Sequence, residues 1–219
     1  MKKEVVFNIK KAYLTPFGIA INGLTILFYG ILLPLNNTYQ RLPIYIIVFI
    51  ALWLLINIIS ICQERNKRID LNKKQVLTYM AVNILCGYSL IIAMSSIYFI
   101  GATVNEFNVF NYWLYLLIIL FVSWIGFHLF CISNFKIINL SINNLIQIIG
   151  IILTLISLIS LLYLGFIVPV TDGENNFIFC GLIALLCVYA LLIRSYYSYS
   201  WYLYLVKNGE KEAECEKRG

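Results

Sequence analysis

Long apolar runs alternate with short polar segments along nearly the whole chain. The apolar runs cover approximately residues 17–35, 42–62, 76–100, 109–131, 145–168 and 177–193, and they are rich in Leu, Ile and Phe. A transmembrane helix needs about 20 mainly apolar residues, whereas a strand of a membrane β-barrel alternates apolar and polar residues. Because backbone amides in lipid must pair within their own segment, the pattern predicts an all-α, polytopic integral membrane protein with a bundle of six transmembrane helices.

The composition agrees with a protein that faces lipid. Of its 219 residues, 62% are hydrophobic and only 12% are charged. Soluble domains have roughly 45–50% apolar and about 25% charged residues. A soluble fold of this length could not bury so much apolar surface, so the lipid bilayer is the first predicted partner.

The polar segment at residues 63–75, QERNKRIDLNKKQ, fixes the predicted orientation. It lies between the second and third apolar runs, and its basic residues are Arg65, Lys67, Arg68, Lys73 and Lys74. Basic loops stay in the cytoplasm. The loops predicted on the opposite side, residues 36–41, 102–108 and 170–176, contain one basic residue, Arg41, and the acidic residues Glu106, Asp172 and Glu174. We therefore predict six crossings of a cell (plasma or inner) membrane with both termini cytoplasmic (N-in/C-in). The abundance of Ile, Asn, Lys and Tyr favours a bacterial source.

The two ends of the chain differ from the predicted six-helix domain, residues 17–206. Residues 1–16 interleave lysines with apolar side chains, which predicts a short amphipathic helix on the inner leaflet; a disordered basic leader is the alternative. Residues 207–219 form a charged cytoplasmic tail. Between them, the aromatic-rich residues 195–206 follow Arg194, so the last helix is either strongly tilted or continues past the interface among lipid headgroups. We expect Arg194 to snorkel to the inner surface, with burial against the bundle as the alternative.

Several polar residues share one predicted depth, in the inner third of the bilayer. They are Asn22, Asn57, Asn83, His128 and Gln147, with Arg194 near the inner end of the last span. Amides in hydrocarbon seek partners on other helices. The layer has two interpretations, which are hydrogen bonding between helices and a polar vestibule open to the cytoplasm.

Small and hydroxyl residues recur on one face of the fifth span, at Gly150, Thr154, Ser157 and Ser160. Such residues allow helices to approach closely. The same seam could line a narrow pore.

The sequence contains no motif that predicts catalysis, and no catalytic residue is assigned. It has no HExxH motif, no glycine-rich phosphate loop and no Cys-x-x-Cys pair, so no metal or cofactor is expected. No Asp or Glu lies in the middle of a span, which argues against proton- or sodium-coupled carriers. The net charge of +6 is explained by membrane orientation, so we expect no direct binding to nucleic acid.

Function is predicted from layout. Six spans, a basic amphipathic leader and a basic cytoplasmic loop between spans two and three resemble the general plan of ABC-2-type permease subunits of exporters. The resemblance implies a membrane-embedded transport subunit, whose basic loop (Arg65 to Lys74) would dock a separate ATPase. Two alternatives stay open: a non-catalytic accessory, immunity or defence protein that acts on a protein partner such as a toxin, and an oligomeric channel built from copies of this chain.

Overall fold

The computed structural model describes residues 2–11, 14–35, 42–138, 142–170 and 175–216. Within these ranges every regular element is a helix and there is no strand, which confirms the all-α part of the predicted fold class. The helices are α1 (Lys2–Lys10), α2 (Leu14–Leu35), α3 (Ile44–Arg65), α4 (Lys73–Val104), α5 (Phe110–Asn134), α6 (Asn143–Ile167) and α7 (Asn176–Glu216).

Five of these helices are long and apolar enough to cross a membrane. They are α3, α4, α5, α6 and the part of α7 that ends at Asn208, while the apolar stretch of α2, Pro16–Ile31, is shorter. Their outward surfaces are apolar, and on α6 the side chains of Ile159 and Phe166 are 64% and 72% exposed. Length, composition and this apolar exterior suit a location in a membrane.

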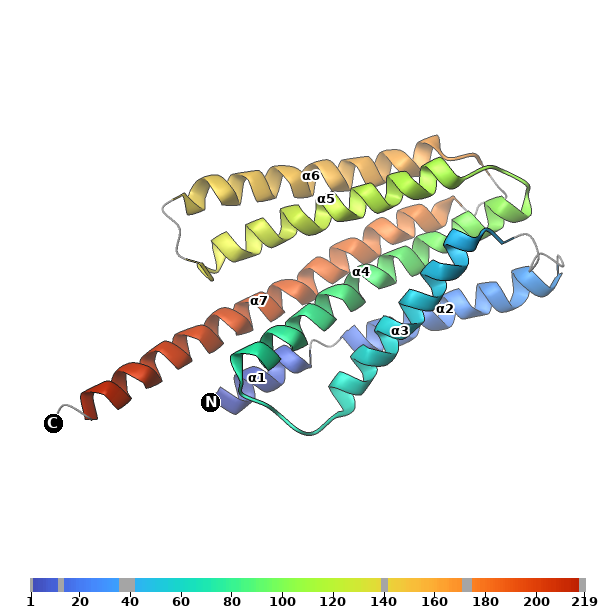
Figure 1. The fold of residues 1–219 in the computed structure, drawn as a ribbon. Helices are drawn as coiled ribbons and strands as arrows, with labels where there is room; N and C mark the ends of the chain where they lie inside the picture. The colour runs from blue at the N-terminus through green and yellow to red at the C-terminus, as the bar shows by residue number, and fades with distance from the viewer. Residues whose placement is uncertain (1, 12–13, 36–41, 139–141, 171–174, 217–219) are drawn as a thin grey trace.

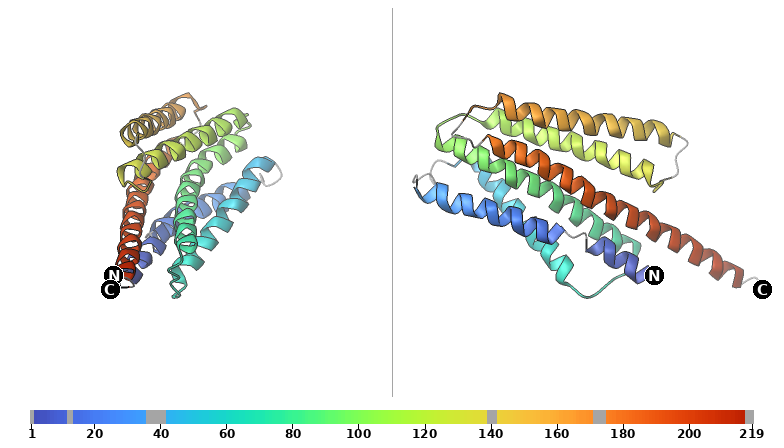
Figure 2. Two further views of the ribbon diagram at one scale, coloured as in Figure 1. Left: turned by 60° about the vertical axis from the view of Figure 1, so that its left-hand side comes forward. Right: turned by 180° about the vertical axis from the view of Figure 1, so that it is seen from behind.

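Helices α4 and α7 lie in the middle of the molecule. The α5–α6 hairpin lies on one side of this pair, and α2 and α3 lie on the other (Figures 1 and 2). Small residues bring the central pair together: a Cβ atom on Gly87 would lie 2.7 Å from Val188, and one on Gly181 would collide with the Ser95 hydroxyl. Close packing at glycine is the usual way in which helices associate in lipid.

Helices α5 and α6 pack tightly against each other through glycines on both. A Cβ atom on Gly150 would lie 2.5 Å from the backbone nitrogen of Phe130, and one on Gly126 would lie 2.8 Å from that of Thr154. The hydroxyl of Thr154 donates to the carbonyl of Gly150 at 2.8 Å, and that of Ser157 to the carbonyl of Thr154 at 2.7 Å. Gly150 and Thr154 of the predicted seam therefore face α5, Ser157 is buried, and Ser160 is half-buried.

The end of the bundle opposite α1 is built mainly from aromatic side chains. Trp113 of α5 lies edge-to-face with Phe49 of α3 and Phe99 of α4, with ring centroids 5.1 Å apart in both pairs. The hydroxyl of Tyr98 donates to the carbonyl of Pro169 at 2.9 Å and so joins α4 to the segment that follows α6. These contacts fix the relative heights of α3, α4 and α5 and of the segment that follows α6.

The amphipathic pattern of α1 predicted that its apolar face would contact lipid. In the structure this face contacts protein instead. It packs on α4 and α7, and Val5, Val6 and Ile9 are buried there. The same end of the molecule contains the α3–α4 loop and the last turns of α7 (Figure 1). We call this end the α1 end.

Helix α7 continues without a break through Arg194 and on to Glu216, into the predicted tail. Its tyrosines alternate in direction beyond Arg194: Tyr196, Tyr199 and Tyr202 are buried, whereas Tyr197 and Tyr204 are exposed. Arg194 is itself exposed. One face of the aromatic-rich segment therefore packs in the protein core, and the other face is exposed at the surface.

Candidate functional site

The α1 end contains the most concentrated polar contacts of the described chain, and Lys10 is at their centre. Lys10 is only 3% exposed, and its Nζ donates to the backbone carbonyls of Asn66 and Arg68, both at 2.5 Å. The ammonium also lies over the ring of Tyr79, 5.3 Å from its centroid. Burial lowers the pKa of Lys10, and the carbonyls and the ring offset part of this desolvation. The contact fastens α1 to the α3–α4 loop.

Gln63 and Asn83 complete this junction. The Gln63 side chain donates to the Asn83 Oδ1 at 3.0 Å and approaches the carbonyls of Lys10 and Tyr79 at 3.2 and 3.1 Å. Asn83, fully buried, donates to the carbonyl of Ile9 at 2.7 Å. We call Lys10, Gln63 and Asn83 the polar junction. It satisfies carbonyls at the C-terminus of α1, which have no partner inside that helix.

Asn22 and Asn57 form a separate pair deeper in the bundle. Asn22 Nδ2 donates to Asn57 Oδ1 at 3.0 Å, and Asn57 Nδ2 donates to the carbonyl of Trp53 at 2.7 Å. The Cys86 thiol approaches the same Asn57 oxygen at 3.8 Å. This pair joins α2, α3 and α4 in the manner of hydrogen-bonded membrane helices.

The other members of the predicted polar layer lie elsewhere. His128 Nδ1 is 2.8 Å from the hydroxyl of Tyr196, so this contact joins α5 to α7. Gln147 donates to Asn134 Oδ1 at 3.3 Å, at the turn between α5 and α6. Arg194 is exposed. The six predicted residues, all within the described part of the chain, therefore lie in five separate places, and only Asn22 and Asn57 bond to each other.

The basic side chains of the loop at residues 65–74 lie at the protein surface. Arg65, Lys67, Arg68, Lys73 and Lys74 are all exposed. Local hydrogen bonds fix the backbone beneath them: Asn66 Oδ1 accepts from Arg68 N at 2.9 Å, Asp70 Oδ1 from Asn72 N at 2.9 Å, and Asn72 Oδ1 from Lys74 N at 3.2 Å. The Tyr202 hydroxyl of α7 donates to the Leu71 carbonyl at 2.8 Å. The loop is therefore a preorganised basic surface.

One polar cluster of the structure was not expected from the sequence. Ser123 of α5 lies between two tyrosine hydroxyls, at 3.3 Å from that of Tyr88 on α4 and in close contact with that of Tyr189 on α7. Hydroxyl residues are common in apolar helices, so no spacing along the chain distinguished these three. Gln63 was missed for a different reason, since it borders the polar segment and was assigned to the loop.

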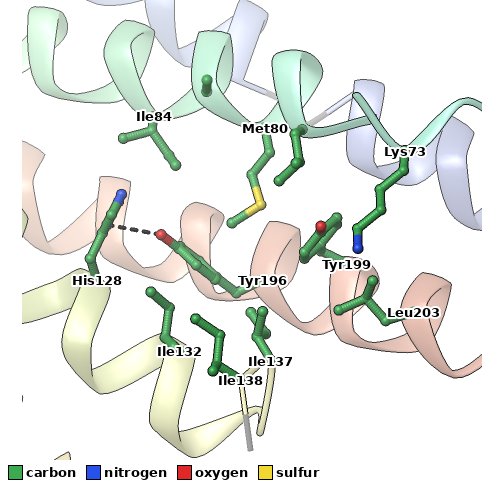
Figure 3. Close-up of a pocket in the computed structure, with 12 residues that line it drawn as sticks. Lys73, Met80, Ile84, His128, Ile132, Ile137, Ile138, Tyr196, Tyr199 and Leu203 are labelled. Atoms are coloured by element: carbon green, nitrogen blue, oxygen red, sulfur yellow. Dashed lines mark hydrogen bonds between the residues drawn. The ribbon is translucent and has the colours of Figure 1, made fainter. Parts of the chain in front are cut away.

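A groove lies between α4, α5 and α7 near the α1 end. Its volume is about 410 Å3, and Figure 3 shows the side chains around it. Most of its lining is aliphatic, with polar groups from Lys73, His128, Tyr196 and Tyr199. Lys73 points toward Tyr199 at one end, whereas His128 and Tyr196 lie at the other (Figure 3). We call this cavity the α4–α5 groove.

The described residues contain no cluster of His, Cys, Asp or Glu that could bind a metal ion. The polar groups of the α1 end include amides, tyrosines, lysines, arginines and the Asp70 carboxylate, which suit binding through hydrogen bonds and charge.

Residues 3–212 match the family model described as a domain of unknown function (DUF5079). The chain belongs to this family. No curated protein and no solved structure matches the chain. The family description states no activity, so function has to be argued from the geometry of the α1 end.

Proposed function

We propose that the protein crosses a bacterial cell membrane six times, by α2 to α7, with the α1 end in the cytoplasm. The described ends of α1 and α7 lie at the same end of the molecule, and the basic loop lies there too (Figure 1). The positive-inside rule supports the cytoplasm for that end.

Within this topology we propose a membrane-embedded transport subunit that works with a separate ATPase. The observation that supports it best is the pair of hydrogen bonds from Lys10 to the carbonyls of Asn66 and Arg68. Lys10 binds these carbonyls from the buried side of the loop. The side chains of Arg65, Lys67 and Arg68 are exposed at the protein surface. A rigid charged surface loses less conformational entropy when it binds a partner.

The proposed docking surface also couples to the membrane helices. The loop is fastened to α1 by Lys10 and to α7 by Tyr202, and Gln63 and Asn83 extend the contact into α3 and α4. Movement imposed on the loop by a partner would be transmitted to α4 and α7, the central pair. This is the arrangement that a transport subunit driven from the cytoplasm requires.

Co-purification tests this proposal. The full chain carrying Arg65→Glu, Lys67→Glu and Arg68→Glu should lose an ATPase that co-purifies with the wild type, because opposite charge repels an acidic docking surface. Lys136→Glu, an exposed charge in the α5–α6 turn, is the matched control and should retain it. Wild-type protein that captures no ATPase from its own membranes would contradict the transport function.

A non-catalytic accessory or immunity role is the second candidate, because the same basic surface would suit any acidic protein partner. It predicts that the triple charge reversal releases a partner without ATPase activity. Identifying the released protein by mass spectrometry separates the two functions.

A further inference from the structure

The α4–α5 groove is continued by a second cavity along the same two helices. This second cavity has a volume of about 280 Å3. Its lining residues are Ile84, Leu85, Tyr88, Ile92, Leu117, Leu120, Phe121 and Trp124. Ile84 lines both cavities, so they adjoin at this residue; we call the two together the track, whose lining extends from Lys73 to Ile92.

The track exists because α5 stands away from α4. Helix α5 packs along α6, and near the α1 end it is joined to α7 by His128 and Tyr196, while α4 and α5 have few close backbone contacts. The side chains of Leu77, Leu85 and Phe121 on the rim are 44%, 55% and 58% exposed. The track is therefore open sideways, toward the surroundings of the bundle.

The length of the track fits one hydrocarbon chain. Between Met80 and Ile92, helix α4 rises roughly 18 Å, slightly more than half of the roughly 30 Å hydrocarbon core of a bilayer. The track therefore extends along α4 for about the depth of one leaflet.

The two ends of the track differ in polarity. The end toward Ile92 is lined by apolar side chains, with the Tyr88 hydroxyl directed to Ser123. The opposite end has the Lys73 ammonium beside Tyr199 (Figure 3). Within the described ranges no ion pair to Lys73 is recorded, and the nearby Asp70 carboxylate accepts from the backbone of Asn72. The cation is therefore available to an anion at the mouth of the track.

We propose that this track binds an anionic phospholipid from the leaflet at the α1 end, with one acyl chain along α4 and α5 and the phosphate at Lys73. A cation beside a laterally open apolar track matches the charge and the apolar chains of such a lipid. One lysine near an anionic headgroup gives a preference of about fivefold over a neutral lipid. The site needs no docked protein partner.

Competition between two lipids tests the site. The full chain, purified in neutral detergent, is mixed with equal amounts of phosphatidylglycerol and phosphatidylcholine. Native mass spectrometry then measures how much of the protein with one bound lipid carries each of the two lipids. The wild type should retain phosphatidylglycerol about fivefold more often. Lys73→Gln should remove this preference, whereas Lys74→Gln, a neighbour outside the groove lining, should keep it.

A second pair of variants tests the track itself. Ala81→Phe should lower the retention of both lipids because Ala81 lines the groove, whereas Thr78→Phe, on an exposed surface of the same helix, should not. Circular dichroism establishes that each variant is folded. Equal retention of the two lipids by the wild type, or equal losses in Lys73→Gln and Lys74→Gln, would overturn the proposal.

Discussion

Asn83 is a single side chain that connects three elements of the α1 end. It lies on α4, accepts from Gln63 at the end of α3 and donates to the carbonyl of Ile9 in α1. With no exposed surface, it has no water to replace either bond. Asn83 contributes to the stability of the folded protein mainly by hydrogen bonding to its two partners, since a buried polar group without a hydrogen-bond partner costs about 1–3 kcal/mol.

Replacing Asn83 with leucine should therefore destabilise the protein by about 1–3 kcal/mol, because the carbonyl of Ile9 loses this partner and Gln63 loses one of its three acceptors. The loss is measured as a lower unfolding temperature of the full chain in detergent. Asn144→Leu, at an exposed site on α6, provides the comparison and should change stability by less than about 0.5 kcal/mol. Equal effects of the two substitutions would show that the polar junction adds nothing to stability.

Two helical glycines offer a second matched pair. A Cβ atom on Gly150 would lie 2.5 Å from the Phe130 nitrogen, whereas one on Gly23 would meet nothing within 4 Å. Gly150→Ala should destabilise the α5–α6 hairpin by about 1–3 kcal/mol, because the obstruction is backbone and cannot move aside easily. Gly23→Ala should be neutral or stabilising by up to about 1 kcal/mol. Denaturant titration of both variants checks this, and a stable Gly150→Ala would mean that the two helices pack less closely than described.

Depth along a helix could be read from the sequence, but direction around its axis could not. Asn22 and Asn57 share a depth and are hydrogen-bonded to each other, and both lie on helices that pack on α4. His128 has a similar depth yet points to Tyr196 on α7. A hydrogen bond between helices depends on the position of a residue along its helix and on the direction of its side chain around the helix axis. In helices that are apolar all round, the sequence indicates only the position along the helix.

At the scale of elements, Lys10 holds the α3–α4 loop against α1, in addition to the apolar packing of α1 on α4 and α7. Lys10→Met keeps the length of the side chain but loses both bonds to loop carbonyls, so the loop should open more often. Trypsin should then cleave after Lys67 or Arg68 several-fold faster than in the wild type, because proteases cut transiently opened segments. Lys3→Met removes an exposed lysine of the same helix and should leave the rate unchanged.

The positions of the long helices could be predicted because apolar length is nearly sufficient to define them. The surface on which α1 packs could not be predicted, because a helix face containing Val5, Val6 and Ile9 suits lipid and protein equally well. For α7, a signal was present: Tyr196, Tyr199 and Tyr202 are spaced by three residues, and all three are buried. That spacing indicates one face of a continuing helix, which is the course that α7 takes beyond Arg194.

At the scale of the whole molecule, the contact between α1 and the loop restricts the number of crossings. Helix α2 runs from the α1 end, where Gly18 is close to Asn57 of α3, toward the opposite end, where Tyr29 contacts Ser96 of α4. Helix α3 then returns, and its end is bound to α1 through Lys10. If α3 crosses the membrane and α1 stays beside the loop, α2 has to cross as well.

Six crossings place Asn66 in the cytoplasm and Asn105 and Asn175 outside. Single cysteines at these positions, in a chain without its native cysteines, report the topology with a thiol reagent that does not cross membranes. Asn105→Cys and Asn175→Cys should be labelled in intact cells, and Asn66→Cys only after lysis, which also controls for access to the thiol. Labelling of Asn66→Cys in intact cells would reverse the orientation. Labelling of Asn105→Cys without Asn175→Cys would mean that α5 and α6 do not both cross, since these two helices separate the two sites.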